Sequence, residues 1–224
     1  MPFTRPSMNA RLPGKVVRLS STSVQRVEAH TIQRELSLCP NATIYAFEPQ
    51  PKQAEKLRER FKENERIYIF ENAVGDVETY RTLNIAERNA SSSLLPVTDF
   101  GLMAAPFASA KQQIEVSTVS LDHWYMRLED PPSTIDLIKI DTQGFEKYVI
   151  SGGGSVLQKT RYVILEAAFR PVYEGQALYE DLVLMMKDHL FSIQAVGAGY
   201  FNRASGDLIE VDILFEKREG VDLS

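Results

Sequence analysis

Short apolar runs alternate with amphipathic segments along most of this chain. Thr43–Phe47 and Ile67–Phe70 are apolar and aromatic runs that end at polar residues, a pattern typical of buried strands. Between them, Ala54, Leu57 and Phe61 recur at i, i+3 and i+7 with charged residues in between, which predicts an amphipathic helix. A strand, a helix and a strand within about 30 residues predict a parallel unit with a right-handed crossover.

The second half of the chain repeats this alternation. Residues 135–140 and 162–166 are apolar runs that we predict as buried strands, and each precedes a segment with helical apolar spacing. Three glycines at 152–154 end the first of these helices. The last two apolar runs, 191–196 and 211–215, lie too close for a helical crossover, so we predict that they pair antiparallel.

The middle of the chain is less regular. Residues 80–85 and 114–121 have the composition of strands and flank a serine-rich segment at 89–93. They also flank a stretch with Gly, Ala and Pro at 99–110. We interpret residues 99–110 as a mobile surface loop or lid.

This alternation predicts an α/β fold with a doubly wound, mostly parallel sheet and an antiparallel last strand. We place the domain at residues 16–217, with a poorly ordered N-terminal extension at 1–15 and a C-terminal tail at 218–224. Ligands of such sheets bind at the carboxyl ends of the strands. The residues expected along that edge are 20–23, Glu48, Pro49, Asn72, Ala73, Asp141, Thr142, Gln143 and Glu166.

Composition excludes several classes of protein. Hydrophobic residues make up 44% and charged residues 25%, which excludes a collagen-like, coiled-coil or mainly disordered chain. The single cysteine, Cys39, excludes a disulfide framework and a multi-cysteine zinc site, and we expect no metal. No apolar run approaches the ~18–20 residues that cross a bilayer, and the N-terminus lacks the apolar core of a signal peptide. We therefore expect a cytoplasmic protein without a transmembrane segment.

Charge and glycine are unevenly distributed. Residues 1–27 carry five basic residues and no acidic one, which leaves 20 basic and 30 acidic residues for the rest of the chain. An acidic body argues against a nucleic-acid groove, because phosphate binding requires clustered Lys and Arg. We therefore predict no nucleic-acid partner. None of the twelve glycines lies between Gly14 and Gly75.

Two strand ends carry candidate nucleotide-binding residues. Glu48 follows its strand where the second strand of a nucleotide fold carries a carboxylate that accepts the ribose hydroxyls. An exposed Glu before a turn explains this residue about equally well. The small residues of Asn72-Ala-Val-Gly75 would let an adenine ring lie against the backbone, although a tight turn explains them nearly as well.

A third strand end is richer in polar groups. Asp141, Thr142 and Gln143 follow a buried strand and begin a helix. Asp141 could face a cationic cofactor or take a proton from a substrate hydroxyl, and Gln143 could orient it by a hydrogen bond. The alternative is helix capping, with Glu146 exposed in the first helical turn, and it carries more weight for Glu146 than for Asp141.

The sequence resembles the FkbM-type methyltransferases, which are S-adenosylmethionine-dependent O-methyltransferases. The resemblance extends from about residue 41 to residue 217, and the order of its motifs makes it specific. The motifs are Tyr45-Ala-Phe-Glu-Pro-Gln-Pro51, Asn72-Ala-Val-Gly-Asp76, Ser92-Ser-Leu-Leu95, Asp136-Leu-Ile-Lys-Ile-Asp-Thr-Gln-Gly-Phe-Glu146, Leu165-Glu166 and Tyr173-Glu-Gly-Gln176.

This resemblance implies a class I methyltransferase, Rossmann-like sheet with a reversed last strand, an S-adenosylmethionine cofactor, and a small-molecule or glycan acceptor. The cofactor site that it implies has Glu48 with Pro49 at the ribose, Asn72, Ala73 and Val74 at the adenine, and Asp141 near the methionine end and the methyl acceptor. Asp141 and Gln143 are then the catalytic candidates. We hold His123 in reserve as a base, and we favour a solvated turn over an acceptor-site role for Ser91, Ser92 and Ser93.

The departure from the family lies in the region without glycines. Where family members have a loop of the type Asp-x-Gly-Ala-Asn-x-Gly, this chain reads Arg18-Leu-Ser-Ser-Thr-Ser-Val24. The lost glycines let backbone approach the cofactor, and Val24 is bulky and β-branched. Arg18 would put a positive charge where a carboxylate normally meets the cationic part of the cofactor. Such a reversed contact at ~5 Å and an effective dielectric constant of 20 is worth roughly 3 kcal/mol.

Three explanations of this segment compete. Residues 1–27 are an eroded first strand and loop, or sequence from another reading frame, or a divergent site, and we favour the first two. A non-catalytic relative that serves as a binding or scaffold protein is accordingly the alternative to an enzyme. A nicotinamide-dependent oxidoreductase is disfavoured, because the chain has no Gly-x-Gly-x-x-Gly motif.

Overall fold

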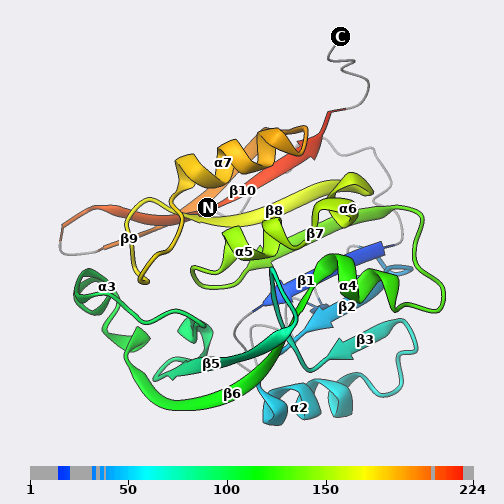
Figure 1. The fold of residues 1–224 in the computed structure, drawn as a ribbon, viewed down its shortest axis with the longest axis horizontal. Helices are drawn as coiled ribbons and strands as arrows, with labels where there is room; N and C mark the ends of the chain where they lie inside the picture. Colours follow the sequence, from blue (N-terminus) through cyan, green and yellow to red (C-terminus); the bar gives the residue numbers. More distant parts are fainter. Residues whose placement is uncertain (1–14, 21–31, 34–35, 38, 203–204, 219–224) are drawn as a thin grey trace.

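The chain folds around one large sheet. A computed structural model describes residues 15–20, 32–33, 36–37, 39–202 and 205–218, and backbone alone within 15–20. Seven strands form the large sheet in the order β3-β2-β1-β7-β8-β10-β9 (Figure 1). Their bounds are β1 Lys15–Ser20, β2 Thr43–Phe47, β3 Ile67–Phe70, β7 Ile135–Asp141, β8 Thr160–Ala168, β9 Phe191–Phe201 and β10 Leu208–Lys217.

Strand directions confirm the predicted fold class. β1 is the middle one of the five parallel strands; it runs parallel to β2 and to β7, and the β2–β3 and β7–β8 pairs are also parallel. β10 pairs antiparallel with both β8 and β9, which confirms the predicted antiparallel ending. The structure is therefore an α/β protein with a doubly wound, mostly parallel sheet.

The segment without glycines still supplies an interior strand of the large sheet, between β2 and β7. Residues 16–19 were the expected first strand, and β1 begins one residue earlier, at Lys15. The rest of the expected extension, the loop at 21–24 and most of the expected tail lie outside the described residues. The backbone of Ser20 is in register with Asp141, so β1 and β7 end side by side.

Helices cover the large sheet, at 51–61, 146–151 and 179–188 as the hydrophobic spacing predicts and at two further places where it predicts none. The bounds are α2 Pro51–Phe61, α4 Leu121–Met126, α5 Glu146–Ser151, α6 Gly154–Gln158 and α7 Tyr179–Asp188. Figure 1 shows α5, α6 and α7 along the part of the sheet formed by β7, β8 and β10. Val149, Leu157 and Met186 from these helices are fully buried in one core with Ile138 and Leu165 of the sheet.

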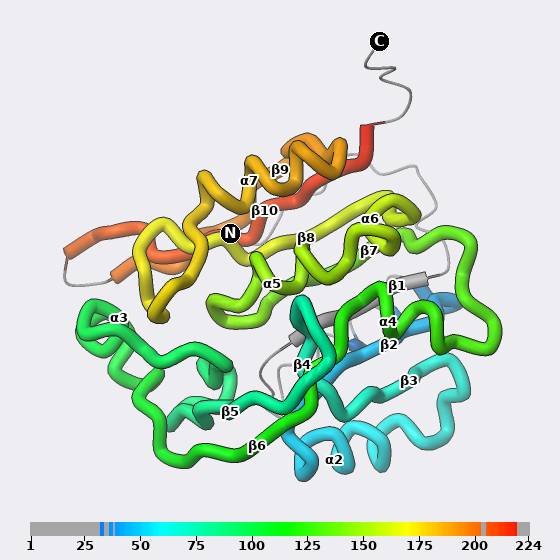
Figure 2. The backbone as a smooth tube through the Cα atoms, viewed as in Figure 1, coloured from blue at the N-terminus to red at the C-terminus, as the bar shows by residue number. Residues whose placement is uncertain are grey.

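A second sheet of three strands, in the order β4-β6-β5, lies beside the first. It consists of β4 Ala73–Gly75, β5 Thr79–Ala86 and β6 Ala110–Ser120, so the strands predicted at 80–85 and 114–121 are confirmed. In Figure 2 the chain can be followed from β6 through α4 into β7. The second sheet therefore connects directly to the strand that carries Asp141.

Residues 99–110, which we interpret from the sequence as a mobile surface loop or lid, have helical structure over most of the stretch. It contains a short helix, α3 Asp99–Ala104, and a 3-10 turn, η2 Pro106–Ala108. Thr98 caps α3, since its hydroxyl oxygen accepts a hydrogen bond from the Gly101 N–H at 2.9 Å. The cap anchors α3 to the rest of the domain, because the Thr98 N–H donates to the carbonyl of Val172. A lid role for α3 stays a prediction.

Candidate active site

The carboxyl ends of the parallel strands meet at one edge of the sheet and bring the predicted residues there. Glu48 follows β2, Asp141 is the last residue of β7, and Glu166 lies near the end of β8. This is the edge at which doubly wound sheets bind ligands.

Gln143 connects the polar groups at this edge. Its side-chain N–H groups donate to Asp141 Oδ1 at 3.2 Å and to Glu166 Oε2 at 2.6 Å. Its carboxamide oxygen accepts a hydrogen bond from the Tyr173 hydroxyl at 3.0 Å. The backbone of Gln143 has a φ of 51°, in the left-handed region that non-glycine residues rarely adopt. Such conformations cluster at functional sites, where surrounding contacts hold the strained residue in place.

Three buried serines, in the segment that follows β5, support this network. The Ser93 hydroxyl donates to the Gln143 carbonyl at 2.6 Å, and the Tyr173 hydroxyl also contacts the Ser91 carbonyl at 2.9 Å. The Ser92 hydroxyl oxygen accepts from the Ala86 N–H. The expectation of a solvated turn at 91–93 is therefore wrong. Backbone partners satisfy the hydroxyls of Ser92 and Ser93 and offset the cost of burying them.

Acidic side chains outnumber basic ones in this cluster. The Lys139 ammonium lies 3.2 Å from Asp141 Oδ2 and 3.6 Å from Asp212 Oδ1. Burial, together with the charge of Asp141, raises the pKa of Glu166 well above its ordinary value and the pKa of Glu210 to about 7. Among the side chains that the structure describes, Lys139 forms ion pairs with two acidic groups, Asp141 and Asp212. A cationic ligand would therefore be stabilised here.

Glu146 is not exposed in the first turn of its helix, contrary to expectation. It is only 2% exposed, and its Oε1 accepts hydrogen bonds from the Thr142 N–H, the Thr142 hydroxyl and the Gly144 N–H at 2.9, 3.1 and 3.2 Å. The carboxyl group thus satisfies the backbone of the tight turn between β7 and α5. Burial raises the pKa of Glu146 to about 7, although these hydrogen bonds oppose the change.

Glu48 is also buried, at 1% exposure, so an exposed Glu before a turn is excluded as its explanation. Its Oε1 accepts a hydrogen bond from the Gln50 N–H at 2.8 Å. Pro49 is buried beside it. The turn after β2 is therefore an ordered part of the edge, and the ribose-binding role of Glu48 stays a prediction.

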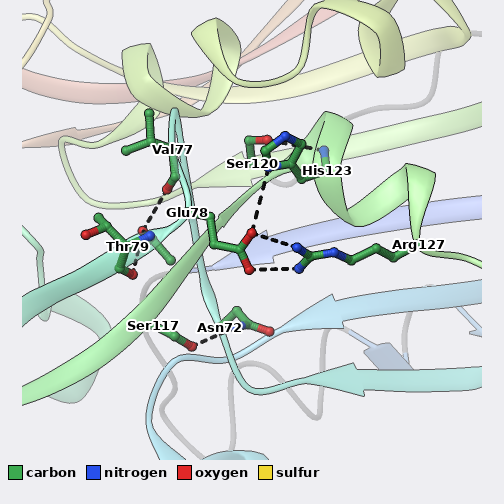
Figure 3. Close-up of polar contacts among 9 residues, drawn as sticks. Asn72, Val77, Glu78, Thr79, Ser117, Ser120, His123 and Arg127 are labelled. Atoms are coloured by element: carbon green, nitrogen blue, oxygen red, sulfur yellow. Dashed lines mark hydrogen bonds and ion pairs between the residues drawn. The ribbon is translucent and has the colours of Figure 1, made fainter.

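The predicted adenine-binding residues lie at the start of the second sheet. Asn72 donates from its side-chain amide to the Ser117 hydroxyl at 2.7 Å (Figure 3). Ala73 and Val74 are buried in two different hydrophobic clusters. Contact between these two residues and an adenine ring would consequently involve their backbone rather than their side chains.

His123, the reserve base, belongs to a separate surface cluster. Its Nδ1 lies 3.9 Å from Glu78 Oε2, and the Arg127 guanidinium donates two hydrogen bonds to the same carboxylate at 2.8 and 2.7 Å (Figure 3). The hydrogen bonds from Arg127 lower the pKa of Glu78. No contact found among the described residues joins His123 to Asp141, so His123 gains no support as a base.

Neither a metal site nor a membrane span was found in the described part of the chain. There, no group of three or more His, Cys, Asp or Glu side chains is arranged to hold a metal ion. No helix within the described ranges is long and apolar enough to cross a bilayer.

Sequence comparison identifies relatives of this chain. A family model described as "Methyltransferase FkbM domain" matches residues 25–193, so the match begins directly after the segment 18–24. A curated relative, the 2-O-methyltransferase NoeI of Sinorhizobium fredii, is 33% identical over 151 residues. That alignment covers 64% of this chain and 61% of the relative, so the match spans about three fifths of the relative's length.

Structural comparison yields methyltransferase-like folds. The Methanococcus jannaschii fibrillarin pre-rRNA processing protein matches with a TM-score of 0.51 at 10% identity, over 95% of this chain and 70% of that chain. Aeropyrum pernix fibrillarin with bound S-adenosyl-L-methionine matches with a TM-score of 0.49 at 11% identity, over 93% and 69% of the two chains. At such low identity the first likeness supports the fold alone.

Proposed function

We propose that this chain, which belongs to the FkbM methyltransferase domain family, is an S-adenosylmethionine-dependent O-methyltransferase acting on a hydroxyl group of a small molecule or glycan. The observation that carries the proposal is the set of Asp141, Gln143 and Glu166, joined by hydrogen bonds at the ligand-binding edge of the sheet. The similarity to a protein named as a 2-O-methyltransferase supports a hydroxyl as the acceptor.

The charges at this edge fit a cationic cofactor. The carboxylates of Asp141 and Asp212 both lie against the single ammonium group of Lys139, so two acidic groups face one cation. A sulfonium at ~5 Å from one ionised carboxylate gains roughly 3 kcal/mol at an effective dielectric constant of 20. S-Adenosylmethionine, when bound, supplies an electrophilic methyl group. We propose that its holding residues are Glu48, Pro49, Asn72, Ala73, Val74 and Asp141.

Asp141 and Gln143 have distinct roles in this proposal. Asp141 accepts the proton of the acceptor hydroxyl, a task that suits a carboxylate fixed beside the acceptor. Gln143 fixes that carboxylate, because its amide holds Asp141 and Glu166 while Tyr173 holds its oxygen. Positioning of this kind supplies most of the acceleration in a bimolecular transfer.

A non-catalytic binding or scaffold protein is the second candidate, and the segment 18–24 favours it. The family match begins after this segment, which lacks the glycines of the family loop. If the loop is degenerate, reverting Arg18, Ser20 and Val24 to Asp, Gly and Gly raises the affinity for S-adenosylhomocysteine. An unchanged affinity would mean that the loop has been aligned in the wrong register.

A methyl-transfer assay tests the enzyme proposal. The chain is incubated with S-adenosylmethionine and a panel of hydroxylated acceptors, and methylated products are detected by mass spectrometry. Product formation should be lost in Asp141→Asn. Asp136→Asn, the same change near the opposite end of β7, is the matched control and should keep the activity. Equal activity of Asp141→Asn and the parent chain would remove Asp141 from the mechanism. The cytoplasmic location and the lack of a nucleic-acid partner stay predictions.

A further inference from the structure

A small cavity borders the residues that hold Gln143. Its volume is about 150 Å³, and it lies between the second sheet, the buried serines and Tyr173. Its lining includes Asn84, Ser91, Ser93, Val97, Ala108, Ala110 and Tyr173.

The cavity has one polar and one apolar side. Among the described residues the Ser91 hydroxyl makes no hydrogen bond, and Asn84 uses its amide to donate to the Ser93 carbonyl at 3.2 Å, which leaves its second N–H. Val97 and Ala108 supply apolar surface. This combination suits a group with hydroxyls on one side and C–H groups on the other.

Charge and size restrict what the cavity can hold. None of its lining residues carries a charged side chain, and an ionised group buried without a partner is strongly disfavoured. A volume of 150 Å³ equals about five liquid waters at roughly 30 Å³ each. The ligand group must therefore be neutral and no larger than a single ring.

Two residues that line the cavity also form hydrogen bonds with Gln143 of the polar cluster. The Ser93 hydroxyl donates to the Gln143 carbonyl at 2.6 Å, and the Tyr173 hydroxyl lies between the Gln143 amide oxygen and the Ser91 carbonyl. A ligand in the cavity would touch Ser91, Ser93 and Tyr173, two of which hold Gln143 directly. A ligand in the cavity would therefore affect the contacts that hold Gln143 in position.

We infer that this cavity is the acceptor subsite of the methyltransferase and takes a neutral, hydroxyl-bearing group no larger than one sugar residue. The assignment of the cavity to the methyl acceptor rests on the proposed function. The preference for a neutral, hydroxyl-bearing group follows from the residues that line the cavity. Ser91 and Asn84 bind the hydroxyls, and Val97 and Ala108 pack against the carbon face.

A binding experiment tests the subsite without any methyl transfer. The full chain is labelled with ¹³C at alanine methyl groups and titrated, by NMR, with a neutral methyl hexopyranoside and with the matching methyl hexuronate, which adds a carboxylate. The neutral glycoside should shift the methyl signals of Ala108 and Ala110, which both line the cavity, and the uronate should not.

Two filling variants locate the binding. Ala108→Leu and Ala110→Leu should each weaken binding of the neutral glycoside by at least about tenfold, because a few misplaced methylenes in a small pocket have effects of this size. Ala110 is exposed, so its variant remains informative if the buried Ala108→Leu fails to fold. Ala198→Leu, the same change at an exposed position of β9, should leave binding unchanged.

The outcomes separate the subsite from the proposed function. Shifts at Ala108 and Ala110 without methyl transfer would support the subsite and count against the enzyme. Transfer to a glycoside that neither shifts these signals nor responds to the two variants would overturn the subsite and leave the enzyme standing. Equal binding of the uronate would also overturn it.

Discussion

The buried carboxyl group of Glu146 makes the stability of this protein depend on pH. In the unfolded chain this carboxyl ionises above about pH 4.5, whereas in the folded state its pKa is raised to about 7, mainly by burial. Between these values the folded state keeps a proton that the unfolded state has lost. The contribution of Glu146 is therefore most favourable below pH 4.5 and declines as the pH rises to 7. Since each pKa unit corresponds to about 1.4 kcal/mol, the decline amounts to about 3 kcal/mol.

Glu146→Gln isolates this effect, because the amide oxygen can still accept from Thr142 and Gly144 but the side chain cannot ionise. Urea unfolding at several pH values from 4.5 to 8 measures the free energy of unfolding of both proteins. The parent chain should lose about 3 kcal/mol more than the variant across this range. Glu180→Gln, in the exposed first turn of α7, is the control and should retain the parent's pH dependence. Parallel curves for the parent and Glu146→Gln would refute the reasoning.

Two further predictions concern the supports of the site. Gly101→Ala should lower the free energy of unfolding by about 1–3 kcal/mol in urea titrations, because its Cβ would lie 2.3 Å from the Val172 carbonyl oxygen. Gly154→Ala, whose Cβ would meet nothing closer than 3.9 Å, is the control and should not destabilise; equal losses would disprove the close contact. Tyr173→Phe removes the hydroxyl that holds Gln143 and should lower kcat while leaving S-adenosylhomocysteine affinity unchanged, as steady-state kinetics and calorimetry would show. An unaltered kcat would deny Tyr173 a positioning role.

Much of the sheet could be predicted from hydrophobic periodicity. Buried parallel strands require continuous apolar runs, and 135–140 and 162–166 are such runs. The connection between 191–196 and 211–215 is too short for the helical crossover that a parallel pair needs. It therefore predicts antiparallel pairing, and β9 and β10 pair in this way. These features depend on local sequence, so one sequence was enough.

The buried polar residues could not be predicted in the same way. Glu146 and Ser92 have side chains that are usually exposed, and they are buried because backbone N–H groups of neighbouring segments need acceptors. The turn at Gln143 has a left-handed backbone, and the Ser93 hydroxyl donates to its carbonyl. The partners of Glu146 and Ser92 lie only two to six residues away, but contacts between a side chain and nearby backbone leave no periodic signal in the sequence.

Sequence reasoning also missed some members of the polar cluster. Lys139 was read as part of a buried strand, and Glu210 and Asp212 were not considered as site residues. The sequence does indicate that Glu210 and Asp212 share a face. They alternate with the buried Val211 and Ile213, so both lie on one face of β10. Only the antiparallel pairing of Asp212 with Glu166 brings that face to the end of β8.

Titration calorimetry with S-adenosylhomocysteine tests the central claim most directly, because it asks whether the edge of this sheet binds the cofactor product at all. If the chain is a functional methyltransferase, we expect a saturable heat of binding that corresponds to one ligand per chain at submillimolar concentrations. The absence of heat at near-millimolar ligand would contradict the enzyme proposal and favour the non-catalytic alternative.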